Sequence, residues 1–473
     1  MITFTLISFY VVATLISYWG YSVIYNIFFS PLRKVPGPLI NLIFPMTSRF
    51  YTINGTYPSY SANLHKKYGN IVRTSWNAVS ISSDESAKEV YSTYSFAKAS
   101  FYNGFQIAGE TVFSTRKKEF HRERKKILAS SFSDKSILQV EYLVKENVHN
   151  LVKKVGEMSS NKECFNLGLY FHYFSFDVIG DLAFGKSFDT LKNGHHPVID
   201  WIKNFFFISL MVGIFPFLKH YKFDSITQLY KFSYEAIENS KRNSDRTTIM
   251  STLINASDPD TGKKLSEKEI VEESILQLVA GSDTTSNSLN WVFYLLSKHP
   301  KVCMKLKNHL KDEFEDQSQI NFVKCKEECD YLRAVIYEGL RISPVVPGGV
   351  PRIVPRGGKV IEGYFIPEKT GTVVDINYIQ NNSTYWEEPN VFKPERWIDQ
   401  NGKFQSHKNF MPFLIGPRAC LGRSLAWMEL YLATASLVYN FNFKLKDEED
   451  VKSKSFIVNA PEKPIAIYAF KNE

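Results

Sequence analysis

The first 30 residues contain no charged side chain, and this stretch constrains the chain more than any other. Residues 2–19 are mainly Ile, Leu, Val, Phe and Tyr, and about 20 such residues can cross a bilayer as a helix. Arg33 and Lys34 follow, and the positive-inside rule then places the rest of the chain on the cytosolic side. A cleaved signal peptide is the alternative, but a basic start and a small-residue cleavage site are missing. We therefore expect a single-pass transmembrane anchor over residues 1–30.

A proline-rich segment follows the anchor. Pro36 and Pro38 each lack a backbone donor and restrict the residue before them, so no helix can continue. We expect a stiff hinge over residues 31–40 and one large folded domain over residues 41–473. Cytosolic topology would leave the N-glycosylation sequons of that domain unmodified. They lie at Asn54, Asn255, Asn381 and Asn382.

Composition narrows the class of protein. With 44% hydrophobic residues, the chain of 473 residues has ample material for a large core. Its net charge of +9 is spread along the sequence, which favours membrane lipid or an acidic protein partner over nucleic acid. The five cysteines form no CxxC pair and no even framework, so a disulfide-stapled or zinc-ribbon protein is not expected.

A long helical pattern dominates the middle of the chain. Ser266 and Glu269 form a capping-box signature, and an apolar-rich pattern then continues to Leu296. His299 and Pro300 end it. This spacing predicts one helix of about 30 residues, roughly 45 Å long.

Other segments complete the predicted architecture. We expect a helix over residues 331–342, a strand over residues 371–374 and a helix over residues 423–439. The apolar segment 205–218 is too short to span a membrane. It is either a buried helix pair broken at Gly213 and Pro216 or a lid that dips into the membrane interface. Together the patterns predict a mainly α fold with small β-sheets.

A glycine-rich loop precedes the last of these helices. Cys420 lies between Gly416 and Gly422, and the following helix N-terminus favours a thiolate. The glycines permit close approach to a flat ligand, on which Phe413 can pack. Arg418 can meet a carboxylate. A buried, inert cysteine is the alternative.

These residues match the FxxGxRxCxG signature of the cytochrome P-450 family, which the segment resembles at every fixed position. The resemblance implies a helix-rich catalytic domain around a buried haem b, whose iron takes Cys420 as its thiolate ligand. The segment from Pro347 to Gly358 resembles fungal members, and the anchor is typical of the membrane-anchored eukaryotic type. The resemblance also implies the endoplasmic reticulum membrane as the location.

Two further motifs resemble the same family. The segment 280–285, Ala-Gly-Ser-Asp-Thr-Thr, is similar to the oxygen-activation motif, and we expect the helix to open locally there. Asp283 and Thr284 would then form a proton path. Glu338 and Arg341 resemble the ExxR motif, in which Arg396 completes a buried structural triad.

Basic residues resemble the family's haem propionate contacts. Arg352 precedes a predicted strand at the position where the family has such an arginine. His121 and Lys125 share a helix face, although arginine is usual where Lys125 stands. For these two residues, a solvated basic face or a docking surface for an acidic electron donor remains an equal alternative.

The resemblance implies a monooxygenase that inserts one atom of dioxygen into an apolar small molecule, in secondary metabolism or detoxification. Since the chain has no nucleotide-binding fingerprint, a separate NADPH-cytochrome reductase, a flavoprotein, would supply electrons. Apolar pocket walls are expected at residues 96–107, 205–218, the turns before Ala280, and 345–350. A haem-thiolate isomerase or dehydratase, or a haem protein without turnover, are the alternatives. The intact Asp283–Thr284 pair favours the monooxygenase.

Overall fold

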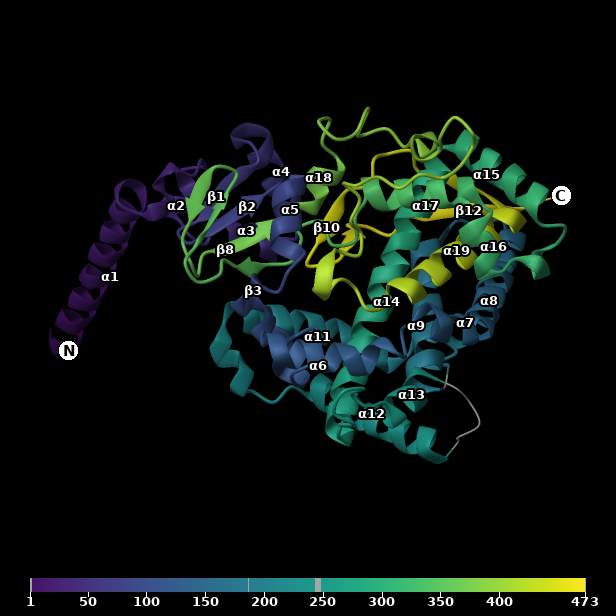
Figure 1. Ribbon diagram of the computed structural model, residues 1–473, viewed down its shortest axis with the longest axis horizontal. Helices are drawn as coiled ribbons and strands as arrows, with labels where there is room; N and C mark the ends of the chain where they lie inside the picture. The colour runs from purple at the N-terminus through teal and green to yellow at the C-terminus, as the bar shows by residue number, and fades with distance from the viewer. Residues whose placement is uncertain (1, 186, 243–247, 473) are drawn as a thin grey trace. The chain divides into compact units, whose positions relative to one another are not determined.

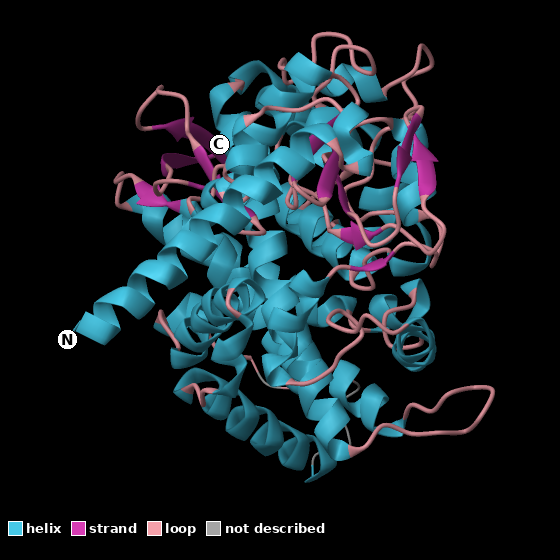
Figure 2. Ribbon diagram, turned by 90° about the vertical axis from the view of Figure 1, so that its left-hand side faces the viewer, coloured by secondary structure: helices cyan, strands magenta, loops and turns pink. Residues whose placement is uncertain are grey.

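The computed structural model describes residues 2–185, 187–242 and 248–472. They form two compact units (Figure 1), each of which is described by itself. The first unit comprises residues 1–99, 347–379 and 455–457. The second comprises residues 100–346, 380–454 and 458–473. Helices far outnumber strands (Figure 2), as the sequence predicts.

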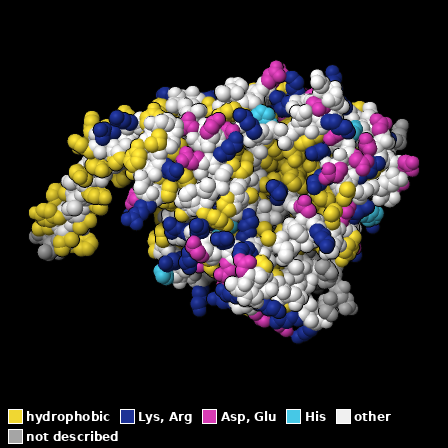
Figure 3. All heavy atoms as spheres, viewed as in Figure 1, with side chains coloured by type: hydrophobic (Ala, Val, Ile, Leu, Met, Phe, Trp, Pro, Cys, Tyr) yellow, Lys and Arg dark blue, Asp and Glu magenta, His cyan; other side chains and the backbone are white. Residues whose placement is uncertain are grey.

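The first unit begins with α1 (Ile2–Phe28). Large apolar side chains of this helix, such as Phe4, Phe9 and Tyr18, are exposed, and Figure 3 shows hydrophobic atoms covering it. Residues 6–28 are long and apolar enough to cross a membrane. The other helices of the unit are short. They are η1 (Pro31–Lys34), α2 (Ile40–Ile43), α3 (Thr47–Ile53), α4 (Tyr57–Tyr68), α5 (Asp84–Tyr91) and most of α18 (Ile376–Gln380).

A five-stranded sheet organises the first unit. Its order is β1-β2-β8-β5-β3, and only the β2–β8 pairing is parallel. Gly349, at φ +67°, passes so close to the end of β8 that an added Cβ would lie 2.0 Å from the Val374 carbonyl oxygen. The strands are β1 (Ile71–Ser75), β2 (Ala78–Ile81), β3 (Ala97–Lys98), β5 (Arg352–Ile353) and β8 (Gly371–Val374), with a hairpin of β6 (Lys359–Ile361) and β7 (Tyr364–Ile366).

The second unit is built around α14 (Glu267–Lys298). The predicted start and end are confirmed: Ser266 and Glu269 form a capping box, and His299 is the C-cap. Most of the helix is buried, as befits a helix inside a core. α9 (Leu167–Phe184) packs along it most extensively, with Ile179 against Gly281. α17 (Asp330–Ile342) approaches closely at Gly339, where an added Cβ would lie 2.7 Å from Val292.

Further elements surround α14. The predicted helix 423–439 is confirmed as α19 (Arg423–Asn440), and the apolar segment 205–218 divides into α11 (Pro197–Ile214) and η3 (Pro216–His220). The predicted break at Gly213 and Pro216 is confirmed to within one residue, because α11 ends at Ile214 and Pro216, which lacks a backbone donor, begins η3. The remaining helices are η2 (Ser100–Ala108), α6 (Lys118–Ala129), α7 (Asp134–Gln139), α8 (Glu141–Ser160), α10 (Thr190–Asn193), α12 (Asp224–Arg242), α13 (Ile249–Asn255), α15 (Pro300–Glu313), η4 (Gln317–Gln319), α16 (Phe322–Glu327), η5 (Pro394–Trp397) and η6 (Gly416–Arg418). The strands are β4 (Phe165–Asn166), β9 (Phe441–Leu445), β10 (Ser453–Ser455), β11 (Asn459–Pro461) and β12 (Ala466–Lys471).

Candidate functional site

The loop that carries Cys420 is closed by its own backbone. The Cys420 N–H donates to the Phe413 carbonyl oxygen at 2.9 Å, so the residues between them form a compact turn. Within it, Leu414 and Gly416 have positive φ angles of 58° and 75°, a region that glycine adopts readily and leucine rarely. The turn ends at Gly422, the N-cap of α19. The motif therefore folds into a hydrogen-bonded turn that holds the Cys420 thiol at the start of α19.

Desolvation and the charges around Cys420 act in opposite directions on its thiol. Although the residue as a whole is exposed, desolvation by the surrounding protein raises the pKa of the Cys420 thiol, while the Gly422 N–H and the charges of Arg423 and Lys125 act to lower it. The N-terminal N–H of the helix and the two cations thus act toward the thiolate, as the sequence predicts, while desolvation opposes them. A bound metal cation would displace the thiol proton outright.

The two residues of α6 that resemble propionate contacts have different surroundings. The Lys125 ammonium donates to the Pro417 carbonyl oxygen at 2.7 Å, which joins α6 to the Cys420 turn. Burial, with Arg423, lowers the pKa of Lys125. His121 is buried at 4% exposure and Arg418 at 9%. The structure thus gathers three basic side chains and the thiol within the second unit.

Arg352 belongs to the first unit. It is buried in β5, its guanidinium lies 5.1 Å from the centre of the Tyr91 ring, and it donates to the Pro351 carbonyl oxygen. This local packing fixes its backbone in the sheet.

Asp283 and Thr284 of α14 have different hydrogen-bonding partners. The Thr284 hydroxyl donates to the Ala280 carbonyl oxygen at 2.8 Å, one turn back along the same helix. The expected local opening is absent, and α14 is continuous through this segment. Such back-bonding satisfies serine and threonine hydroxyls within a helix, and Ser282 and Ser288 do the same.

The sequence did not identify the partner of Asp283. Nδ1 of His172, on α9, lies 3.1 Å from Oδ1 of Asp283. No local pattern connects two residues so far apart in the chain. The only local indication was a single histidine within the strongly apolar helix α9. Such a histidine is more often a buried residue with a structural hydrogen bond.

Glu338 is the centre of an ion cluster in which it and Arg341 are fully buried and the Arg396 side chain is 10% exposed. Its Oε2 accepts from Arg341 Nε at 2.8 Å, and its Oε1 accepts from Arg396 Nε at 2.9 Å. Two donors that the sequence did not indicate complete its shell: the Trp397 indole N–H at 2.9 Å and the Lys393 backbone N–H at 3.0 Å. The structure therefore brings the three residues of the triad together.

The same cluster extends toward the Cys420 turn through Gln380. Arg341 donates to the Gln380 carbonyl oxygen at 2.8 Å. The Gln380 amide donates to the Leu340 carbonyl oxygen at 3.0 Å and accepts from the Met411 N–H at 3.2 Å. Met411 stands two residues before Phe413, so a continuous chain of contacts joins α17 to the thiol-bearing turn.

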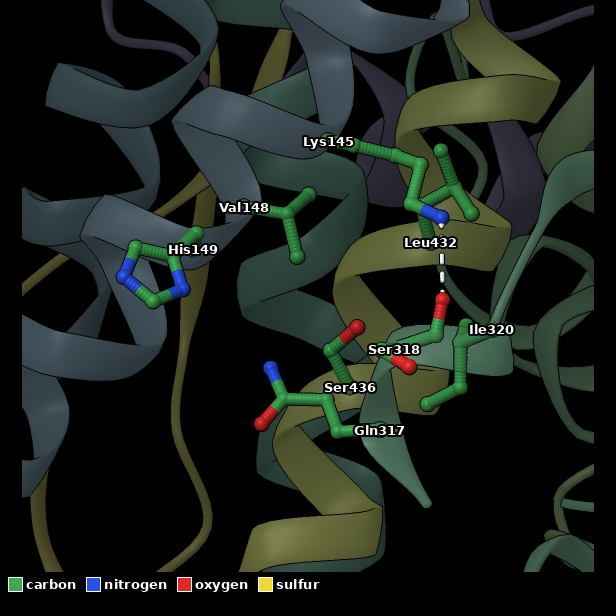
Figure 4. Close-up of a pocket in the computed structure, with 8 residues that line it drawn as sticks. All are labelled: Lys145, Val148, His149, Gln317, Ser318, Ile320, Leu432 and Ser436. Carbon is green, nitrogen blue, oxygen red and sulfur yellow. Dashed lines mark hydrogen bonds between the residues drawn. The ribbon is translucent and has the colours of Figure 1, made fainter. Parts of the chain in front are cut away.

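A half-open pocket lies elsewhere in the second unit. It has a volume of about 280 Å³ between α8, η4 and α19, and Lys145 on its wall donates to the Ser318 carbonyl oxygen (Figure 4). Its walls contain no residue singled out from the sequence. The lining residues are Lys145, Val148, His149, Gln317, Ser318, Ile320, Leu432 and Ser436.

The second unit has the features that a flat, metal-bearing group requires. Ala280 is exposed although it lies in the middle of the mainly buried α14, and Cys420 is exposed at the turn. A Cβ added at Gly422 would meet no atom within 4 Å. A thiol beside basic side chains suits an iron ligand near an anionic macrocycle. Fold and site together define a haem-thiolate protein.

Comparison with known proteins supports the same class. The family model for cytochrome P450 matches residues 36–467. The chain is 31% identical over 444 residues to cytochrome P450 monooxygenase ORF11 of Penicillium roqueforti (strain FM164), covering 89% of this chain and 91% of that protein. It is also 31% identical to cytochrome P450 monooxygenase traB of Penicillium crustosum over 463 residues, covering 91% and 90%. The chain therefore belongs to the cytochrome P450 family.

The fold comparison agrees. A crystal structure of a cytochrome P450 described as CYP102L1 superposes with a TM-score of 0.78 at 19% identity, covering 88% of this chain and 94% of that chain. The predicted family, the mainly α fold and haem with a cysteine thiolate are confirmed. The chain is a haem-thiolate monooxygenase, and the isomerase and non-catalytic alternatives are not favoured.

Proposed function

We propose that this monooxygenase is membrane-bound and inserts one atom of dioxygen into an apolar small molecule, with Cys420 as the iron ligand. The observation that carries the proposal is the closed turn from Phe413 to Cys420 at the start of α19, which presents the thiol on a fixed backbone. When bound, the haem supplies dioxygen activation and the oxygen transfer. Hydroxylation in secondary metabolism or detoxification is the reaction class we infer.

The chain's own residues have narrower roles. Glu338, Arg341 and Arg396 stabilise the turn through Gln380, so the thiol is positioned before any ligand binds. We assign Arg418, His121 and Lys125 of the second unit to the anionic edge of the haem, with Lys125 acting from its contact with Pro417. Phe413 and the glycines at 416 and 422 leave room for the ring. Asp283 and Thr284 pass protons to the reacting side.

Apolar walls support an apolar substrate. η2 and α11 pack so closely that an added Cβ at Gly104 would lie 2.1 Å from the Ser209 carbonyl oxygen. Phe101 and Phe205 both lie against Phe105, with ring centroids 5.6 and 6.3 Å apart. A pocket bounded by such rings would bind and orient a molecule chiefly by burial of apolar surface.

We infer that α1 is a single-pass anchor in the endoplasmic reticulum membrane, with residues 31–40 as hinge and 41–473 as a cytosolic catalytic domain. The exposed apolar side chains of α1 and the basic residues of η1 support this topology. Electrons would then come from a separate NADPH-cytochrome reductase, a flavoprotein in the same membrane.

The ligand assignment is tested by the carbon monoxide difference spectrum of the reduced protein. We expect the red-shifted Soret band of thiolate ligation in the natural protein and in the control variant C303A, and its loss in C420A. Cys303 is a suitable control because it is buried and lies on α15. A red-shifted band in C420A would refute the assignment.

The topology is tested separately. Asn54 and Asn255 are exposed, so a lumenal domain would be glycosylated there, whereas Asn381 is partly engaged by Arg341 and Ile342. We expect no mass change on treatment with an N-glycosidase. Deletion of residues 1–30 should release haem-containing protein from membranes. If the deleted protein remains bound, the exposed apolar residues of α11 and η3 become the membrane contact.

A further inference from the structure

The acid of the proposed proton path has a partner on another helix. His172, on α9, places Nδ1 3.1 Å from Oδ1 of Asp283, and the two side chains are 17% and 25% exposed. This distance puts the two groups in direct polar contact, close enough for the imidazole N–H to donate a hydrogen bond to the carboxylate once the two are aligned. Both groups are therefore partly shielded from water, where such a bond is stronger than at an open surface.

The surroundings hold His172 in this position. Its ring lies parallel to the Phe176 ring at an interplanar angle of 12° and a centroid distance of 6.4 Å. α9 and α14 pack closely beside this contact, since a Cβ added at Gly281 would lie 3.0 Å from Ile179. His172 Nε2 is buried and has no hydrogen-bond partner among the described residues. Asp283 is thus the polar contact that orients the ring.

The alcohol of the pair is held differently. Thr284 donates its hydroxyl to Ala280 on its own helix, while the Asp283 side chain is directed to α9. A carboxylate that is free to rotate has several orientations, and proton transfer requires one of them. A fixed partner removes that freedom.

We propose that His172 is a positioning residue for the proton path: its Nδ1–H holds the Asp283 carboxylate and fixes the orientation from which that acid passes protons. The inference rests on the proposed function, in which Asp283 belongs to this path. It adds a second helix, α9, to the machinery.

The variants H172F and H172N separate the possible roles of the ring. H172F keeps an aromatic ring against Phe176 but removes the donor. H172N keeps an N–H near the position of Nδ1 but cannot titrate. H149F makes the same substitution as H172F on α8, in the wall of the pocket in Figure 4, and is the matched control.

The first measurement is independent of turnover. In the full-length protein in lipid nanodiscs, nitrogen-15 NMR of labelled histidine reports which ring nitrogen carries the proton. We expect a protonated Nδ1 for His172, assigned by its absence in H172F, and a shift to the Nε2-protonated form in D283A. An Nε2-protonated ring in the natural protein, or no change in D283A, would overturn the proposal.

The second measurement is NADPH consumption by the holoenzyme with a flavoprotein reductase and no added substrate. We expect D283A to be about tenfold slower, since general acid catalysis contributes at least that much. H172F should be about threefold slower, and H172N and H149F close to the natural rate. The double variant H172F/D283A should match D283A, because His172 acts through Asp283.

The outcomes distinguish the two ideas. An unchanged rate in D283A would refute the proton path itself. A slow D283A with a normal H172F would refute only the positioning role. A slow H172N with normal haem content would also refute it, since it would require a titrating ring. Additive losses in the double variant would show that His172 acts elsewhere.

Discussion

Two buried glutamates of the second unit, Glu338 and Glu273, are equally hidden and differently surrounded. Glu338 is 0% exposed and accepts from four donors, two of them arginines. Glu273, on α14, is 1% exposed. Its Oε1 accepts from the Val112 N–H at 2.9 Å and lies 3.6 Å from Arg124 Nε, while its Oε2 has no hydrogen-bond partner among the described residues.

The neighbouring donors and charges, and not the extent of burial, distinguish the two carboxyl groups. Burial raises the pKa of Glu273 to about 8, and Arg124 and the Val112 N–H only partly oppose it. Glu273 is therefore mostly protonated at neutral pH, whereas the arginines of Glu338 compensate its charge. Desolvation penalises an ion, and only close, well-aligned partners offset it.

The largest effect is expected from E338Q. It leaves the fully buried Arg341 guanidinium and the partly exposed Arg396 guanidinium without their counter-charge, which costs about 3–5 kcal/mol of unfolding free energy. Urea unfolding of detergent-solubilised protein, followed by haem absorbance, measures the loss, and E273Q at pH 7 is the matched control. We expect E273Q to change little, because it replaces a mostly neutral acid by a neutral amide. Equal losses of unfolding free energy in E338Q and E273Q would contradict the inference that the two glutamates differ in charge.

R396K tests whether geometry or charge matters at Glu338. The lysine keeps the positive charge but loses the fork that reaches Glu338 and the carbonyl oxygens of Glu387 and Glu388. We expect a loss of about 1–3 kcal/mol in the same unfolding measurement. The exposed control R122K should stay within about 0.5 kcal/mol. A tolerated R396K would mean that charge alone suffices.

The pH dependence of stability tests Glu273. Its folded-state pKa of about 8 is above the ordinary 4.5, so the folded protein retains the proton longer than the unfolded chain. The stabilisation is complete below pH 4.5 and is lost as the pH rises to about 8, with a slope of at most about 1.4 kcal/mol per pH unit. E273Q lacks this slope. Parallel curves for the two proteins between pH 6 and 8 would contradict the assignment.

Glu269, one turn before Glu273, should show a smaller effect of opposite sign. Burial by itself raises the pKa of Glu269, but Ser266 and Arg124 outweigh it and lower the pKa to about 2. We expect E269Q to cost up to about 1 kcal/mol at neutral pH, because glutamine can keep the capping box but loses the charge that pairs with Arg124. The cost should disappear as the pH falls from 4.5 toward 2. Unfolding curves at pH 7 and pH 3 measure it.

Local patterns predicted the elements well. The capping box and the proline placed both ends of α14 correctly, and the β-branched run gave the strand Gly371–Val374. Such features are encoded by residues a few positions apart. The error at the centre of α14 has the same origin: propensity predicted an opening, but Thr284 satisfies its hydroxyl on the helix itself.

Contacts between distant segments were beyond local patterns. The pairing of His172 with Asp283, the contact of Lys125 with Pro417 and the bond from Trp397 to Glu338 all depend on tertiary packing. The triad was expected only from resemblance to the family, since an ExxR spacing by itself is common on helix surfaces. Arg124 is the clearest example, because no local pattern indicates that it forms ion pairs with two glutamates of another helix.

The fully buried Gln380 has a consequence for assembly. Its side-chain amide connects the end of α17 to the backbone at Met411, in the loop that leads into the Cys420 turn. Conformational entropy of that turn is thus lost during folding of the polypeptide and does not have to be lost again when a cofactor arrives. The protein's own hydrogen bonds therefore carry the cost of shaping the turn, which leaves more of the intrinsic affinity of the site to retain what it binds.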